Sequence, residues 1–205
     1  MKPNREYRRI DVTGLETRND DNRMIVEGYA TTFNDPYVLF KDGDYTVKEQ
    51  IDRNAFDNTD MSDVIMQYDH EGRVFARIKN GTLRVMPDEH GLKISADLGG
   101  TEIGRQLYEE IKGGYTDKMS FGFTVEKDER TESRDAETGK TEILRTITAI
   151  KKLYDVSAVS LPANDATEIC ARSFGEGVIA EAVRELDAEK ERLRKIAILK
   201  ALLEV

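Results

Sequence analysis

Short runs of alternating apolar and polar residues make up much of the sequence. Alternation with a period of two is typical of half-buried β-strands, because successive side chains on a strand point to opposite faces of the sheet. Turn-forming dipeptides separate several runs, and one of them, Asn80-Gly81, strongly predicts a hairpin. The predicted strands cover residues 7–12, 24–33, 45–51, 64–68, 82–86, 92–98, 119–125, 143–150 and 153–161. Many short strands at nearly regular spacing predict a β-barrel or a β-sandwich.

Two segments depart from this pattern and predict helices. In the first, Thr101 is suited to cap a helix that Gly113-Gly114 ends, with apolar residues at three- and four-residue steps between them. The second runs from about Glu176 to Leu203 and carries an apolar stripe, which predicts a long amphipathic helix. That helix either packs on the protein's own core or pairs with another chain. The predicted fold class is therefore α+β, mainly β, with flanking helices.

Composition narrows the class of protein. The chain has 205 residues, of which 39% are hydrophobic, enough for one core domain with an appendage. No apolar run approaches the roughly 18 residues that a membrane span needs, and the polar N-terminal segment does not resemble a signal peptide. Cys170 is the single cysteine and cannot form an internal disulfide or a zinc cluster, which predicts a cytosolic protein.

The net charge of the chain limits the kinds of partner that it can bind. The 31 Lys and Arg residues stand against 40 Asp and Glu, which gives a net charge of −9. Phosphate backbones are bound mainly through Lys and Arg, so the absence of a long basic cluster predicts no nucleic-acid partner. Residues 126–142 are highly charged and predict an exposed hairpin tip or loop.

Histidine is scarce, so any chemistry that needs an imidazole must use His70 or His90. His70 lies in Asp69-His70-Glu71-Gly72, where a predicted strand ends in a turn, and the flanking acids would fix its tautomer or raise its basicity. The two interpretations are a catalytic base and an ordinary surface histidine.

Two further polar residues lie inside predicted strands. Ser120 stands between bulky apolar residues, and Gly122 two positions later would leave room for a substrate, so Ser120 is either a nucleophile or a buried serine bonded to a carbonyl. Asp155 must face water or be paired, because an unpaired buried charge is costly. It is therefore either on the solvent face of an edge strand or a group that orients an imidazole.

Phosphate-binding and metal motifs are missing from the sequence. There is no Walker loop or GxGxxG fingerprint, and no HExxH or other ligand spacing accompanies the two histidines. The sequence predicts neither a cofactor nor a metal.

Six short motifs follow one another in a fixed order along the chain. They are Val26-Glu27-Gly28-Tyr29-Ala30, Glu49-Gln50-Ile51, Asn54-Ala55-Phe56, Asp69-His70, Met119-Ser120-Phe121-Gly122-Phe123 and Leu153-Tyr154-Asp155-Val156-Ser157. Taken in order, these segments resemble the prohead proteases of tailed bacteriophages, which are serine proteases of capsid maturation related to herpesvirus assemblin. The resemblance covers about residues 24–168. The sequence departs from the family at Arg53-Asn54, where the family often has Pro-Gly, and in the long charged insert at 126–142.

The resemblance implies roles for three residues. It places the general base at His70, the nucleophile at Ser120 and the imidazole-orienting acid at Asp155. The assemblins use a second histidine in the third role. Here His90 is the only other histidine, and it lies in a predicted hairpin turn before Ser120, so we do not assign it to the triad.

The resemblance also implies an architecture and a function. We expect an assemblin-like β-barrel domain at 1–168 and a C-terminal helical extension at 169–205. The expected activity is that of a serine endopeptidase that cleaves capsid scaffold or coat proteins, and itself, inside the immature capsid in the host cytoplasm. A homodimer or larger self-association is expected, with no membrane partner. The alternatives are a non-catalytic capsid-assembly module on the same fold and a plain acidic interaction domain.

Overall fold

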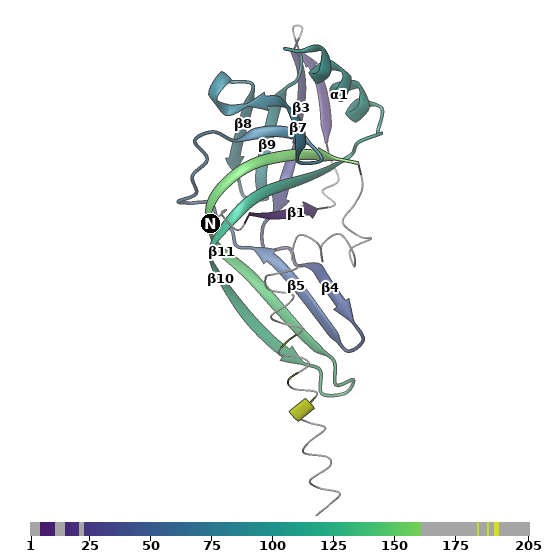
Figure 1. Cartoon of the computed structure of the whole chain (residues 1–205), viewed down its shortest axis with the longest axis vertical. Coiled ribbons are helices and arrows are strands. Elements are labelled where there is room, and N and C mark those ends of the chain that lie inside the picture. The colour runs from purple at the N-terminus through teal and green to yellow at the C-terminus, as the bar shows by residue number, and fades with distance from the viewer. Residues whose placement is uncertain are drawn as a thin grey trace, which may run out of the picture. The chain divides into compact units, whose positions relative to one another are not determined.

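The structure, a computed structural model, describes residues 5–10, 15–20 and 23–160, with the single positions 184, 188, 191 and 192 (Figure 1). The chain divides into two compact units, Met1–Asp165 and Ala166–Val205. The predicted domains at 1–168 and 169–205 stay predictions. Most of the predicted C-terminal helix lies outside the described residues. Its four described positions are helical and exposed, and the long helix also stays a prediction.

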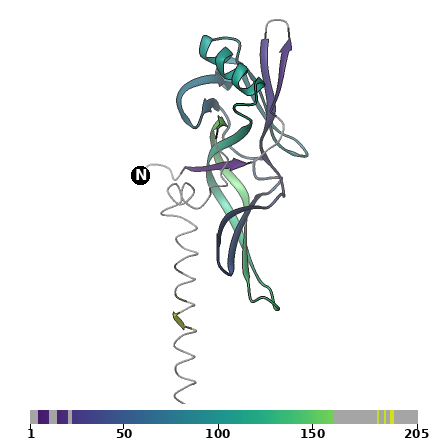
Figure 2. The ribbon, with the colours of Figure 1, turned by 90° about the vertical axis from the view of Figure 1, so that its right-hand side faces the viewer.

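The larger sheet of the first unit has seven strands. Its main path runs in the order β1-β10-β11-β5-β4, while β6 pairs with both β11 and β7. The long β10 and β11 form an antiparallel pair that curves through the unit (Figures 1 and 2). Along its length β11 pairs in parallel first with β5 and then with β6. The strands are β1 (Glu6–Ile10), β4 (Tyr37–Asp42), β5 (Tyr45–Ile51), β6 (Ile65–Tyr68), β7 (Glu71–Arg77), β10 (Lys118–Arg134) and β11 (Thr141–Val159).

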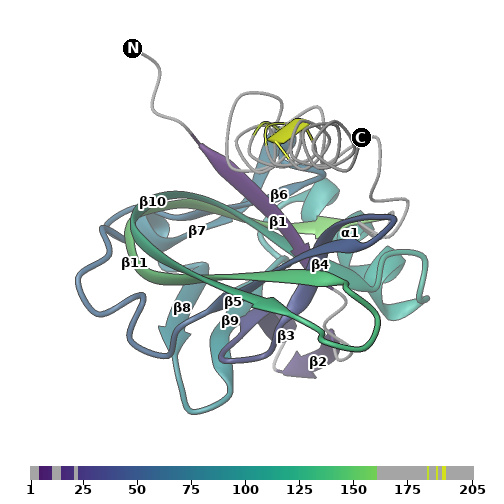
Figure 3. The ribbon, with the colours of Figure 1, turned by 90° about the horizontal axis from the view of Figure 1, so that it is seen from below.

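The second sheet has four antiparallel strands in the order β2-β3-β9-β8. These are β2 (Glu16–Asp20), β3 (Arg23–Thr32), β8 (Leu83–Pro87) and β9 (Gly91–Asp97). A short 3₁₀ helix, η1 (Ile78–Asn80), precedes β8, and the helix α1 (Glu102–Lys112) follows β9 (Figure 3).

The helix α1 forms where the sequence predicts it. The Thr101 hydroxyl accepts a hydrogen bond from the Gly104 N–H at 3.0 Å, as an N-cap does. Leu107, Tyr108 and Ile111 form the buried stripe of the helix and join a core built from both sheets. The core's largest fully buried apolar side chains are Phe121, Phe123, Ile51, Met66, Leu92, Ile94, Leu98, Met119, Ile147, Ile150 and Leu153.

The prediction of a mainly β, α+β fold is confirmed. Among the described residues the strand pairing gives two sheets, so the expected closed or nearly closed barrel is not confirmed. The charged stretch 126–142 is largely strand, because β10 and β11 extend on both sides of a tip at residues 135–140. The runs 143–150 and 153–161 are joined in the single strand β11.

The hairpin predicted at Asn80-Gly81 is wrong. Gly81 has a φ of +75° and donates its N–H to the Ile78 carbonyl, so this dipeptide ends η1. The strand before it, β7, pairs with β6, and the strand after it, β8, pairs with β9. The left-handed glycine that a hairpin turn would use here closes a helical turn instead.

No helix in the described part of the chain is long and apolar enough to cross a membrane.

Candidate active site

His70 lies in a tight turn between β6 and β7. Tyr68 and Glu71 pair across this hairpin, so Asp69 and His70 form its two-residue loop. Both have positive φ angles, 47° and 62°, as a type I′ turn requires. Residues other than glycine rarely adopt this backbone conformation. The turn is fixed by a hydrogen bond in which the Asp69 N–H donates to the Ala158 carbonyl at 3.0 Å. The turn therefore holds the His70 backbone beside the end of β11.

Strand register brings the other two residues to the same place. Asp155 on β11 lies opposite Gly122 of β10 and opposite Ile65 of β6. Ser120 lies two residues before Gly122, on the same face of β10. The central strand therefore contributes the acid, one neighbouring strand the serine and the turn after the other neighbour the histidine.

The three predicted residues are joined by hydrogen bonds. His70 Nδ1 lies 2.5 Å from Asp155 Oδ1, and His70 Nε2 contacts the Ser120 hydroxyl oxygen. An Nδ1–H that donates to Asp155 leaves the Nε2 lone pair to accept a proton from Ser120. This is the relation that general-base activation of a serine requires. Asp155 lies within a central strand, not on the solvent face of an edge strand.

Burial and neighbouring groups define the electrostatics. Ser120 and Asp155 are fully buried, and the His70 side chain is 9% exposed. Asp155 is paired on both oxygens: Oδ1 accepts from the Ser157 hydroxyl at 3.0 Å as well as from His70, and Oδ2 accepts from the Arg5 guanidinium. Both carboxylate oxygens of Asp155 therefore have hydrogen-bond donors, and Asp155 lies where it can balance an imidazolium on His70.

Gly122 lies where the packing around the acid is tight. A Cβ at this position would lie 2.5 Å from Asp155 Oδ2 and 2.8 Å from the Tyr7 ring. The missing side chain therefore makes room for the acid and for β1, and the room for a substrate stays a prediction.

Sequence reasoning missed three residues of the site. Ser157 follows Asp155 by two positions, so strand periodicity placed it on the same face and could have revealed it. Arg5 and Tyr7 carry no such signal. The Tyr7 ring packs edge-on against His70 at a centroid distance of 4.4 Å, and Arg5 lies over Tyr154 at 4.4 Å.

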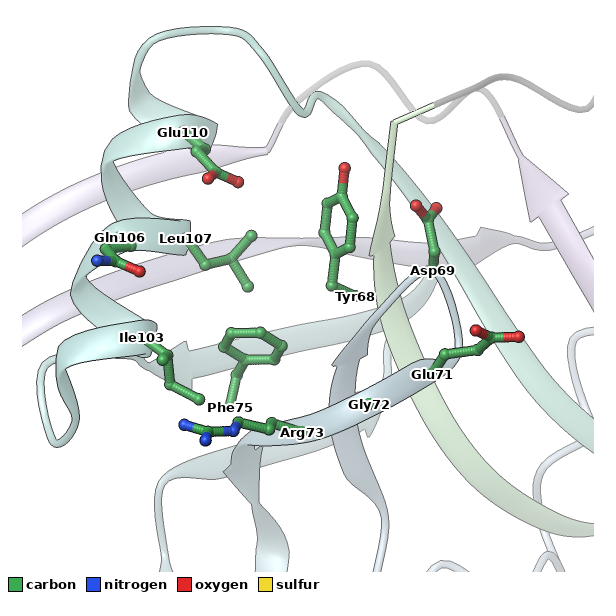
Figure 4. Close-up of a pocket in the computed structure, with 10 residues that line it drawn as sticks. All are labelled: Tyr68, Asp69, Glu71, Gly72, Arg73, Phe75, Ile103, Gln106, Leu107 and Glu110. Carbon is green, nitrogen blue, oxygen red and sulfur yellow. The ribbon is translucent and has the colours of Figure 1, made fainter.

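A cavity of about 630 Å³ opens beside His70, between the β6–β7 hairpin and α1. Figure 4 shows apolar side chains from both elements facing one another across it, with carboxylates from the hairpin and from the helix around it. Its volume falls within the range of protein ligand pockets. Its lining residues are Tyr68, Asp69, Glu71, Gly72, Arg73, Phe75, Ile103, Gln106, Leu107 and Glu110.

His90 lies outside this arrangement. It follows Asp88 in the turn between β8 and β9, and its ring packs against Tyr29 at a centroid distance of 4.7 Å. In the described part of the chain, no three His, Cys, Asp or Glu side chains gather to form a metal site.

Comparison with known proteins shows which family the chain belongs to. The chain matches no curated protein and no solved structure. Residues 13–180 match the family model described as caudovirus prohead serine protease. This match includes the turn of His70 and the strands of Ser120 and Asp155 and spans most of the chain, so the protein belongs to the caudovirus prohead serine protease family.

Proposed function

We propose that this protein is an active serine endopeptidase in which Ser120, His70 and Asp155 form the catalytic triad. The observation that carries the proposal is the continuous hydrogen-bond path from the Ser120 hydroxyl through His70 to Asp155. Membership of a family of prohead serine proteases supports the same reaction.

The reaction follows from this path. The Ser120 oxygen attacks a peptide carbonyl carbon while its proton passes to His70 Nε2. Collapse of the tetrahedral intermediate breaks the C–N bond, and His70 gives the proton to the departing amine. Water then hydrolyses the acyl-serine with His70 again as the base. Asp155 keeps the Nδ1 proton in place and stabilises the imidazolium in both halves of the cycle.

The proposed substrates are capsid scaffold or coat proteins, and the protease itself, inside the immature capsid in the host. The family places its members in prohead maturation. We propose further that the C-terminal extension 169–205 contains the long amphipathic helix from about Glu176 to Leu203, and that this helix docks to these proteins or to a second copy of the chain. The same segment is a candidate for removal by self-cleavage.

One observation favours a second candidate, a non-catalytic capsid-assembly module. Ser120 is fully buried, and its hydroxyl lies 2.8 Å from the Arg8 carbonyl oxygen, which accepts a hydrogen bond from it. A serine whose role was structural would show the same contact.

A mass-spectrometric time course separates the two candidates. The purified protein and its Ser120→Ala variant are incubated at high concentration with a candidate scaffold protein. The protease predicts discrete fragments with the wild type alone. Intact chains in both samples, with both proteins folded, would support the assembly module. Fragments in both samples would mean that Ser120 is not the nucleophile.

A further inference from the structure

We propose that β1 is a resident, substrate-like strand that closes the active site, and that substrates bind as extended peptides in the groove that β1 vacates. The groove recognises a Glu-x-Arg sequence. This inference rests on the proposed protease function and names the substrate class of the same site.

The position of β1 is that of a bound peptide. It lies at the edge of the seven-stranded sheet, beside β10 (Figures 1 and 3). The two strands are antiparallel, with Arg9 opposite Ser120 and Tyr7 opposite Gly122. The other edge of β10 is paired with β11 from Lys118 to Arg134. An extended peptide that joins the nucleophile's strand by main-chain hydrogen bonds must therefore take the place of β1.

The contact between β1 and Ser120 opposes catalysis. A hydroxyl group has one proton, so the Arg8 carbonyl competes with His70 Nε2 for the proton of Ser120. Ser120 is also fully buried, so a substrate carbonyl cannot reach its oxygen while β1 is in place. Departure of β1 frees the serine and exposes it.

Successive side chains from Arg5 to Arg8 contact opposite sides of the groove in alternation. Arg5, just before the strand, and Tyr7 lie against the triad, where Arg5 binds Asp155 and Tyr7 packs on His70. Glu6 and Arg8 face away from the triad toward a buried pair of charges.

The buried pair, Glu49 and Arg145, forms a preorganised binding site. Glu49 on β5 is fully buried and binds Arg145 of β11 at 2.8 Å, and the Tyr37 hydroxyl donates to Glu49 at 2.5 Å. The Arg8 guanidinium binds both oxygens of the Glu49 carboxylate, one of them at 2.8 Å. Glu6 accepts from Arg145 at 2.9 Å. Glu6 and Arg8 of β1 thus bring one negative and one positive charge, so that β1 adds no net charge to the buried pair.

The ion pair between Glu49 and Arg145 remains when β1 leaves, because each residue retains the other as a partner. The groove can therefore exist without β1 and accept another peptide with the same charges. Its preference is for Glu two residues before Arg, since Glu6 and Arg8 make these contacts.

The family match supports this division of the chain. It begins at residue 13, after β1. The strand that covers Ser120 therefore lies outside the segment that matches the family, whereas all three proposed catalytic residues lie within it.

The test measures how fast a small fluorophosphonate labels Ser120 in the full chain. We compare the wild type with Arg5→Ala/Tyr7→Ala, which weakens β1 on the triad side only. The matched control is Val38→Ala/Lys41→Ala on β4, the strand at the other end of the sheet path, where both side chains are exposed. We expect labelling at least tenfold faster in the Arg5/Tyr7 variant and an unchanged rate in the control.

A peptide with the sequence of residues 5–10 tests recognition. It should slow labelling of the Arg5/Tyr7 variant, whereas the same peptide with alanine in place of Arg8 should not. Equal labelling of the wild type and the Arg5/Tyr7 variant would overturn the closure by β1. Equal effects of the two peptides would overturn the Glu-x-Arg preference.

A second readout separates this inference from the protease function. If no protein is labelled, Ser120 is not an activated nucleophile and the proposed function fails. Binding of a fluorescently labelled peptide with the sequence of residues 5–10 is then measured in a Ser120→Ala background. This measurement does not depend on a reactive serine. At least tenfold tighter binding when Arg5 and Tyr7 are also replaced supports the groove, and unchanged or absent binding overturns it.

Discussion

At the scale of the residue, the candidate site depends on close packing around one carboxylate. Asp155 is fully buried and receives hydrogen bonds from His70, Ser157 and Arg5. The backbone of Gly122 lies directly opposite it. Because this space is filled, small changes in shape should affect both the fold and the chemistry.

Replacement of Gly122 by alanine tests that packing. The added Cβ would meet Asp155 Oδ2 at 2.5 Å, so the acid or the strand must shift. We expect a loss of about 1–3 kcal/mol in the free energy of unfolding and roughly a hundredfold loss in kcat/KM. Urea denaturation and a peptide-cleavage assay measure the two effects. Gly100→Ala is the control, because a Cβ at Gly100 has no neighbour within 4 Å.

At the scale of the element, a buried charge network joins β1 to β5, β10 and β11. It contains two arginines and three acids, and Tyr37 donates to it. Although burial alone would lower the pKa of Arg8, the Glu49 carboxylate raises it above its usual value, so Arg8 stays charged. The members of the network are Glu6, Arg8, Glu49, Asp128 and Arg145.

Removal of Glu49 should be the most damaging change in this network. The Glu49→Ala variant removes the fully buried carboxylate that Arg8 and Arg145 share, and we expect a loss of about 3–5 kcal/mol in the free energy of unfolding. Urea denaturation measures it. The control is Glu142→Ala, because the Glu142 ion pair with Lys48 is partly exposed and should matter much less. Equal losses in the two variants would contradict the role of the network.

Glu6 should make stability depend on pH. Burial opposes ionisation of Glu6, but Arg8 and Arg145 outweigh it and hold the pKa of Glu6 below its usual value of 4.5. The stabilisation is therefore present above pH 4.5 and is lost as the pH falls through the lower folded-state pKa. The difference in urea midpoint between the wild type and Glu6→Gln should narrow between pH 7 and about pH 3. A constant difference would contradict this assignment.

At the scale of the whole molecule, the sequence predicts the core strands better than the edges. Strands with one buried face, such as β3, β5 and β9, show the alternation that identifies them. The strands β2 and β7 were missed because much of their surface is exposed, which removes the apolar period. The distal part of β10 was missed for the same reason. The strand β4 was missed because its apolar residues 37–40 are consecutive and show no alternation.

In the candidate site, too, some residues could be predicted from the sequence and others could not. His70, Ser120 and Asp155 were predicted from local context and a family resemblance, and the fold brings them together from three separate elements. The contribution of β1 could not be predicted, because it depends on which edge of the sheet the N-terminal segment joins. Nothing in the residues around Tyr7 specifies pairing with β10, more than a hundred positions later.

The most direct test of the account compares kcat/KM for peptide cleavage in Ser120→Ala, His70→Ala, Asp155→Asn and the triple variant. Residues that act as one catalytic unit are strongly non-additive. We predict losses of about 10³-fold or more in each single variant, and a triple variant no slower than Ser120→Ala. Losses that multiply in the triple variant, or cleavage that survives Ser120→Ala, would contradict the triad.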